Sequence, residues 1–113
     1  MIEVRVPSNV DESPVEHAID QVCNEWGLLV GLRGTLAKQP GSLHWHLKRN
    51  DARGTLEVTF APRSGRLWLT VHTNREATWI EEALLSLPER IALLLIESTT
   101  DAAIDRDPSR SVP

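Results

Sequence analysis

The chain has 113 residues, a net charge of −4 and one cysteine. This length suits a single domain with one core, and 41% hydrophobic and 25% charged residues are ordinary for a globular protein. The lone Cys23 excludes an intrachain disulfide and any multi-cysteine metal site. The opening "MIEVRVPSNV" lacks the features of a secretory signal, and "IALLLI" is too short to cross a bilayer. We therefore expect a cytoplasmic domain of bacterial type with no membrane partner.

The charges are segregated along the chain. Residues 1–27 carry one basic side chain against six acidic ones, and residues 76–113 carry three against eight. Residues 28–75 carry eight basic side chains against two acidic ones. Such a block becomes a positively charged surface if the fold gathers its residues on one side.

The first elements in the chain are a strand and a helix. "MIEVRV" alternates between apolar and polar residues, which indicates a half-buried strand. Ser13, Pro14 and Glu16 together resemble a helix start with a capping box. Apolar residues then recur at helical spacing up to Trp26, Gly27 is a suitable stop, and Cys23 lies on the apolar stripe, where we expect it to be buried.

Residues 28–38, "LLVGLRGTLAK", could form a helix or a strand, and we predict a strand because two glycines and a threonine disfavour a helix. In this strand Leu28, Val30, Leu32 and Leu36 should share one side, with Arg33 and Thr35 on the other. "KQPGS" is then expected to be a turn.

Three more strands are predicted at "LHWHLK", "GTLEVTFA" and "RLWLTVH", separated by turn sequences. Their alternation defines an apolar side, which consists of Leu43, Trp45, Leu47, Leu56, Val58, Phe60, Leu67, Leu69 and Val71. It also defines a polar side, which consists of His44, His46, Lys48, Thr55, Glu57, Thr59, Trp68, Thr70 and His72. Turns centred on residues 51–52 and 63–64 place His46 opposite Glu57 and Glu57 opposite Thr70.

The last element is a helix that starts with a capping box from Thr78 to Glu81 and is interrupted at Pro88. We expect a kink or two abutting helices that run to about residue 100. Residues 101–113 are polar and contain proline, so we expect a disordered tail after one domain spanning residues 1–100. Trp26, Trp45 and Trp79 lie on apolar stripes and should be core residues.

The predicted fold is therefore α+β, with element order β-α-β-β-β-β-α. Its five-stranded, mostly antiparallel sheet has two helices on one face and leaves the other face open. This succession resembles the half-repeat of the TATA-box-binding protein fold over about residues 1–100. The resemblance implies a sheet that is open on the side away from the helices.

The open face is where we expect function. Basic residues around an exposed indole suit an anionic or aromatic partner, such as a small anion, a nucleic acid or an acidic protein surface. We predict a non-enzymatic binding domain without a cofactor. The predicted ligand-binding residues are Arg33, His44, His46, Lys48, Glu57, Trp68, Thr70 and His72. The alternative interpretation is that exposed cations only keep the sheet solvated.

A metal site is the second hypothesis. His44 and His46 share one face of a strand, and Glu57 lies on the next strand. With His72 one strand further, these residues would suit zinc or another divalent first-row ion. Histidines two residues apart are also common on strands that bind no metal.

Catalysis and self-association are the two remaining classes of function. No nucleophile motif, phosphate-binding loop or paired catalytic carboxylates are present in the sequence, so we predict no catalytic residue. "IALLLIE" is apolar around nearly the whole helix, and one sheet face cannot cover it. A structural homodimer through this helix is therefore the third hypothesis.

Overall fold

The computed structural model describes residues 1–36, 39–50, 52–73 and 77–105, and at positions 32–36, 39–40, 72–73 and 99–105 it describes the backbone alone. The elements are β1 (Ile2–Val4), α1 (Glu12–Trp26), β2 (Leu28–Leu36), β3 (Gln39–Arg49), β4 (Thr55–Ala61), β5 (Arg66–Thr73) and α2 (Thr78–Asp105). The five strands form one antiparallel sheet in the order β1-β5-β4-β3-β2. The predicted α+β class and element order are confirmed.

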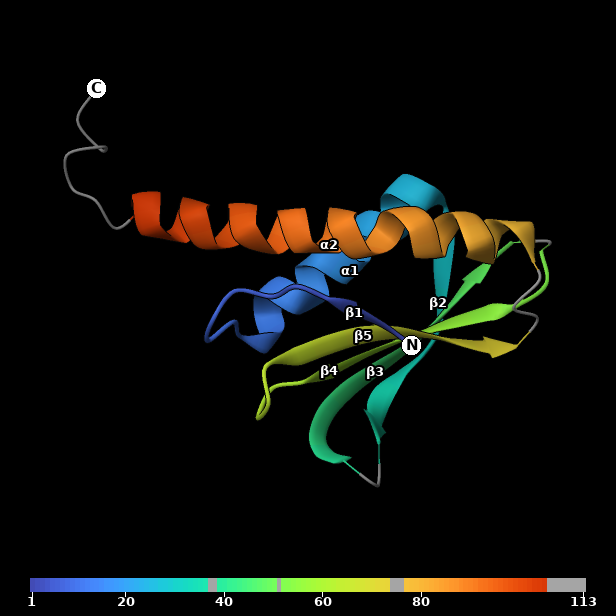
Figure 1. Ribbon diagram of the computed structural model, residues 1–113, viewed down its shortest axis with the longest axis horizontal. Coiled ribbons are helices and arrows are strands. Elements are labelled where there is room, and N and C mark those ends of the chain that lie inside the picture. Colours follow the sequence, from blue (N-terminus) through green and yellow to red (C-terminus); the bar gives the residue numbers. More distant parts are fainter. Residues whose placement is uncertain (37–38, 51, 74–76, 106–113) are drawn as a thin grey trace.

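Both helices pack on the same side of the sheet (Figure 1). The hydrophobic cluster between them combines the apolar side of the strands with one face of each helix. It contains Val15, Ile19, Val22, Trp45, Leu47, Leu56, Val58, Phe60, Leu67, Leu69, Ile80, Leu87, Ile91 and Leu95, all fully buried. Burial of the strands' apolar side explains why the alternation fixed the pairing, because a slip by one residue would bury the polar side instead.

The predicted core positions outside the strands are also correct. Cys23 and Trp79 are buried, and Trp26 is partly buried against the same cluster. The indole Nε1 of Trp79 donates a hydrogen bond of 2.7 Å to the backbone carbonyl of Arg53. This bond ties the start of α2 to the connection between β3 and β4.

The ends of α1 agree in part with the sequence. Gly27 follows the last turn with φ of +66°, and its backbone N–H donates to the carbonyl of Cys23, which is the expected helix stop. The start is different, because Asp11 precedes the helix and Ser13 and Pro14 lie inside its first turn. Pro14 is tolerated there because the first N–H groups of a helix have no carbonyl partner within the helix.

Helix α2 is longer and more continuous than predicted. It is a single helix that passes Pro88 without interruption and extends beyond the expected end to Asp105. The carbonyl of Ala77 accepts its first hydrogen bonds, so Ala77 rather than the predicted Thr78 is the cap residue, and Thr78 is the first residue of the helix. Pro88 removes one backbone hydrogen bond, and burial of Leu87 and Ile91 on either side offsets that loss. Residues 106–113 of the predicted tail lie outside the described residues.

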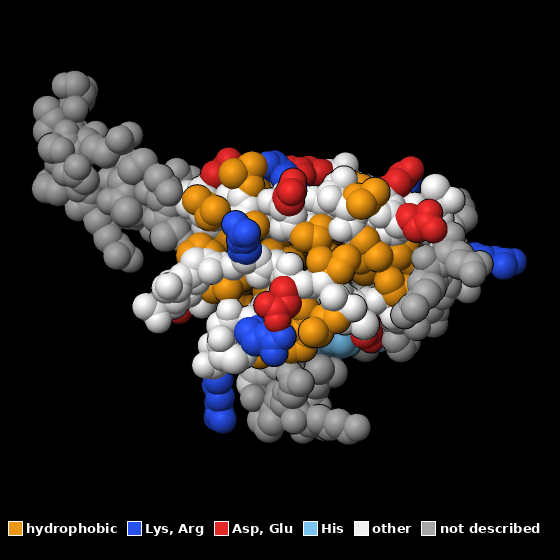
Figure 2. Space-filling view, in the orientation of Figure 1, with side chains coloured by type: hydrophobic (Ala, Val, Ile, Leu, Met, Phe, Trp, Pro, Cys, Tyr) orange, Lys and Arg blue, Asp and Glu red, His pale blue; other side chains and the backbone are white. Residues whose placement is uncertain are grey.

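Part of α2 faces away from the core. Leu85, Leu93 and Ile96 are exposed, and Figure 2 shows hydrophobic side chains at the surface along this helix. The expectation that the sheet cannot cover the whole helix is therefore correct, whereas a homodimer through this surface stays a prediction. Among the described residues, no helix has both the length and the apolar character needed to cross a membrane.

The strand β2 departs from the predicted alternation. Its pairing with β3 shifts between Val30 and Leu32, so Val30 is opposite Leu47 whereas Leu32 is opposite His46. The prediction that Val30 and Leu32 share a side is therefore wrong, because an extra residue in one strand reverses the alternation beyond it. Glycine at position 31 suits such an irregularity.

The predicted turn after β2 is also shorter than expected. Residues 39–42, expected to belong to the turn "KQPGS", are part of β3. Residues 37–38 lie outside the described residues.

One ion pair connects the two helices on the surface. Arg90 of α2 donates two hydrogen bonds, of 3.0 and 2.6 Å, to the carboxylate of Glu25 in α1. Together with a hydrogen bond from Gln21, this contact lowers the pKa of Glu25 to about 2. Both partners of the pair are about a third exposed, so solvent screens the pair and its contribution to stability is small.

The pair predicts a pH dependence of stability. Because the carboxyl pKa is lower in the folded chain, its contribution is complete above about pH 4.5 and is lost as the pH falls towards 2. Glu25→Gln should therefore lower the free energy of unfolding only slightly at pH 7 and by still less at pH 3, as measured by urea denaturation at both pH values. An equal loss at the two pH values would contradict the assignment.

Candidate functional site

The polar face of the sheet lies on the side away from both helices. Across β3 and β4, His46 is paired with Glu57 and His44 with Thr59. Across β4 and β5, Glu57 is paired with Thr70 and Thr59 with Trp68. The two pairings predicted from the turns, His46 with Glu57 and Glu57 with Thr70, are confirmed. Residues directly opposite in an antiparallel sheet share a face, so both rows lie on this side.

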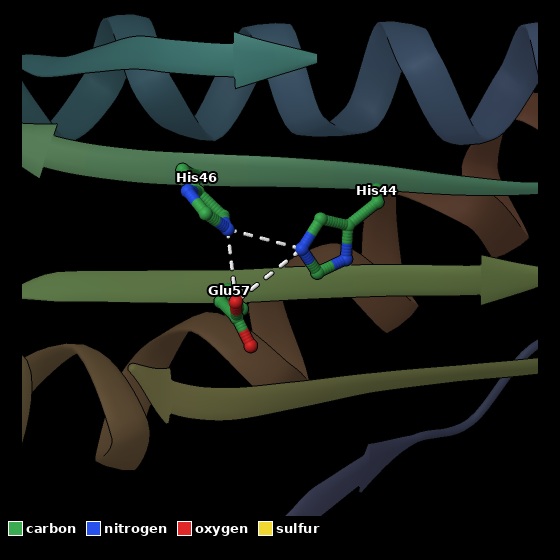
Figure 3. Close-up of side chains that lie close together, drawn as sticks. All are labelled: His44, His46 and Glu57. Carbon is green, nitrogen blue, oxygen red and sulfur yellow. Dashed lines mark hydrogen bonds and ion pairs between the residues drawn. The ribbon is translucent and has the colours of Figure 1, made fainter. Parts of the chain in front are cut away.

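Three of the predicted residues converge on one point. His46 Nε2 lies 2.8 Å from Glu57 Oε1 and 3.0 Å from His44 Nε2, and His44 Nε2 lies 3.3 Å from the same carboxylate oxygen. Figure 3 shows the three side chains pointing towards one another in front of β3 and β4, with helices behind the strands. These residues form the only group of three or more histidine, cysteine, aspartate or glutamate side chains with metal-site spacing in the part of the chain that the structure describes.

The strands explain why the three atoms meet. His44 and His46 are two residues apart in β3 and therefore point to the same side. Their ring centroids are 4.9 Å apart and the rings are inclined by 72°, so the edge of one ring faces the other. Glu57 reaches the pair from the adjacent strand. Each ligand atom is thus carried by a regular strand, which holds it more rigidly than a loop would.

Thr59 orients the more deeply buried histidine. Its hydroxyl oxygen lies 2.9 Å from Nδ1 of His44, and both residues are buried. When Nδ1 carries the ring proton and donates it to this oxygen, Nε2 presents a lone pair to His46 and Glu57. A metal-binding histidine commonly has its second ring nitrogen held in this way.

The site is sheltered on one side and accessible on the other. The side chain of His44 is 10% exposed, whereas those of His46 and Glu57 are 19% exposed. Ser42 and Thr59 are also nearly inaccessible although they lie on the polar face. Solvent and small ligands therefore reach the cluster at His46 and Glu57 rather than at His44.

The remaining predicted residues surround the cluster or lie outside what is described. Lys48 is exposed and shares the face of His46 two residues further along β3, and Thr70 is half-exposed beside Glu57. Trp68 is also half-exposed, and the guanidinium of Arg66 lies 5.4 Å from its ring centre. The backbone of Arg33 is opposite the core residue Trp45. This register position belongs to the helix-covered side of the sheet, so the prediction that Arg33 lies on the polar face is wrong, for the same reason as at Leu32. The side chains of Arg33 and His72 lie outside the described residues.

Thr59 is the residue of the cluster that the sequence interpretation did not assign to a site. The register that places Glu57 opposite His46 also places Thr59 opposite His44. Extending that pairing by two residues would have found it. The hydroxyl was overlooked because threonine is common on the polar side of any strand.

Comparisons with protein-family models, with curated proteins and with solved structures found no match for this chain. The similarity to the TATA-box-binding protein half-repeat is therefore limited to the element order, and the site has to be interpreted from its own geometry.

The bond between Thr59 and His44 predicts the cost of removing the hydroxyl. Thr59→Val keeps the shape of the side chain but leaves Nδ1 of the buried imidazole without this hydroxyl, which costs about 1–3 kcal/mol. The free energy of unfolding, measured by urea denaturation, should fall by that amount.

Thr70→Val is the matched control, because Thr70 lies on the same face but is half-exposed. Its stability should change by less than about 0.5 kcal/mol. Equal losses in the two variants would mean that the hydroxyl of Thr59 does not hold His44.

Proposed function

We propose that this protein binds a divalent first-row transition metal through His44, His46 and Glu57. The observation that carries the proposal is the convergence of two imidazole nitrogens and one carboxylate oxygen within 3.3 Å of one another. Two histidines and one carboxylate form a known donor set for zinc and for non-haem iron, in which further positions stay open to a ligand.

The distances support a metal site. Zinc bound tetrahedrally by nitrogen and oxygen at 2.0–2.1 Å requires its donor atoms to be about 3.3 Å apart. The three separations here are 2.8, 3.0 and 3.3 Å, so movements of a few tenths of an ångström would accommodate the ion. Little conformational entropy has to be lost on binding, because the ligands are already brought together.

The short contacts within the cluster share few protons. A neutral imidazole has one N–H, and a hydrogen on His46 Nε2 can point well at either the carboxylate of Glu57 or His44 Nε2. If the proton of His44 is on Nδ1 and directed to Thr59, its Nε2 contributes only a lone pair. A cation between the three atoms would interact with every one of these lone pairs at once, which supports a metal ion as the natural occupant.

The arrangement favours metal binding over acid–base catalysis by a histidine and glutamate pair. Cys23 is the one cysteine of the sequence, and it is buried in the core on the other side of the sheet, so it cannot serve as a nucleophile beside His46 and Glu57. A base and its orienting carboxylate need a nucleophile or a substrate proton within hydrogen-bond reach.

Zinc titration of metal-free protein tests the proposal. We expect one ion per chain by equilibrium dialysis. We also expect a rise in melting temperature, equivalent to about 2.7 kcal/mol when free zinc reaches a hundred times the dissociation constant. Glu57→Gln keeps the size of the side chain and its ability to accept a hydrogen bond but removes the anionic ligand. It should weaken zinc binding by about a hundredfold or more, because loss of a supporting contact alone costs 10- to 100-fold.

His17→Ala provides the matched control, since His17 is an exposed residue of α1 on the opposite side of the sheet. This variant should bind zinc as the parent chain does. If Glu57→Gln retained the parent affinity, or if His17→Ala lost it, zinc would be binding elsewhere and the proposed site would be wrong.

A further inference from the structure

We infer that the metal site takes a small oxyanion, such as a carboxylate, as its exchangeable ligand, and that Lys48 helps to bind it. This inference rests on the proposed metal function and adds the chemical class of the partner. It is carried by three observations: the side from which the donor atoms approach, the charge of the polar face, and the position of Lys48.

The three donor atoms approach the metal position from one side. All of them project from β3 and β4, and the sheet and helices lie behind them (Figure 3). An ion held by these atoms keeps its remaining coordination positions directed away from the strands. The greater exposure of His46 and Glu57 places the accessible side next to these two residues. An incoming ligand can therefore bind the ion without displacing a protein group.

The charge around these positions favours an anion. A divalent ion with one carboxylate and two neutral imidazoles has a net charge of about +1. The five strands contain only two acidic residues, Glu3 and Glu57. Glu3 is paired with Arg66, whose Nε donates to it at 3.0 Å. On the described part of this face, no second carboxylate is therefore left to neutralise the metal site.

Lys48 supplies a further positive charge on the same face. It follows His46 by two residues in β3 and is exposed. The stem of its side chain crosses towards β2, where its Cδ and Cε lie 3.5 Å from the point at which a Cβ on Gly31 would stand. The end of this stem is thus on the β2 side of His46. Lys48 also belongs to the block of residues 28–75 that carries eight basic side chains against two acidic ones.

Thr70 adds a hydroxyl on the opposite side of the cluster, directly across from Glu57. A ligand with two or more oxygen atoms could bind the metal through one oxygen and accept a hydrogen bond through another. A carboxylate has two such acceptor oxygens, whereas a cation or an apolar molecule has no acceptor oxygen to offer.

The test uses the protein loaded with cobalt(II), whose visible absorption reports its coordination, and malonate as the probe. Malonate should change the cobalt spectrum in a saturable way while cobalt stays with the protein on ultrafiltration. Malonamide has nearly the same shape without the charges, and at the same concentration it should leave the spectrum unchanged.

Two variants distinguish a direct effect of Lys48 on malonate binding from the effect of the overall positive charge of the sheet layer. Lys48→Met should still bind cobalt but should weaken malonate binding about three- to fivefold, the effect of a partly exposed charge interaction. Arg63→Met removes an exposed cation of the same block in the turn after β4. The end of β4 at Ala61 is already about 13 Å from Glu57 along the strand, so screening weakens any effect of Arg63 on the site. This variant should bind malonate within about 1.5-fold of the parent chain.

The outcomes distinguish this inference from the proposed function. The anionic ligand is wrong if cobalt binds but malonate leaves its spectrum unchanged, changes it no more than malonamide does, or removes the cobalt from the protein. In each of these cases the metal site itself stands. If Lys48→Met and Arg63→Met weaken malonate binding equally, Lys48 has no local role. If cobalt does not bind at His44, His46 and Glu57, both proposals fail.

Discussion

The antiparallel pairing of β3 with β4 is the constraint on which the rest of the structure depends. It is imposed from the buried side, where Trp45 is opposite Val58 and Leu47 is opposite Leu56, all of them fully buried. A shift of β3 by one residue would expose Trp45 and Leu47 and bury the two histidines, at a cost of several kcal/mol. The position of His46 opposite Glu57 is thus a consequence of core packing. The placement of the candidate site residues across β3 and β4 is therefore set by hydrophobic residues on the other face of the sheet.

One face of the sheet stabilises the fold, and the other carries the polar groups of the candidate site. The face under α1 and α2 is filled by large apolar side chains, and that packing holds the strands rigid. The opposite face can then carry a cluster of polar groups whose mutual contacts contribute little net stability. A metal ligand set benefits from this division, because rigid strands keep the donor atoms together even when no ion holds them. Thr59 belongs to the same arrangement, since it fixes the ring of His44 from the strand next to it.

The segregation of charge along the chain becomes a segregation between the helix layer and the sheet layer. Most acidic residues lie in or next to the helices, whereas the strands and their turns carry the basic block. Because the helices lie behind the sheet, the negative and positive parts of the chain lie on different layers of the fold. The proposed metal site is in the positive layer, and its charge would have the same sign with a divalent ion bound. The inferred preference of this site for small anions over cations agrees with that arrangement.

The sequence by itself determined the element types, the buried side of three strands and the pairings of Glu57 with His46 and Thr70. Period-two alternation next to short turns admits only one register that keeps the apolar side buried. It did not determine the reversed alternation in β2 or the passage of α2 through Pro88. An irregular pairing depends on the neighbouring strand, and a proline is tolerated where packing on both sides outweighs one lost hydrogen bond.

The convergence of His44 Nε2, His46 Nε2 and Glu57 Oε1 was decided only by the tertiary structure. Alternation places three side chains on one face but leaves their rotamers open, and the same residues could point apart. The contact with Thr59 holds the ring of His44, and the pairing of β3 with β4 brings Glu57 to His46. Residue type and face can be inferred from the pattern along the chain, whereas distances of about 3 Å between ligand atoms depend on how the strands are packed.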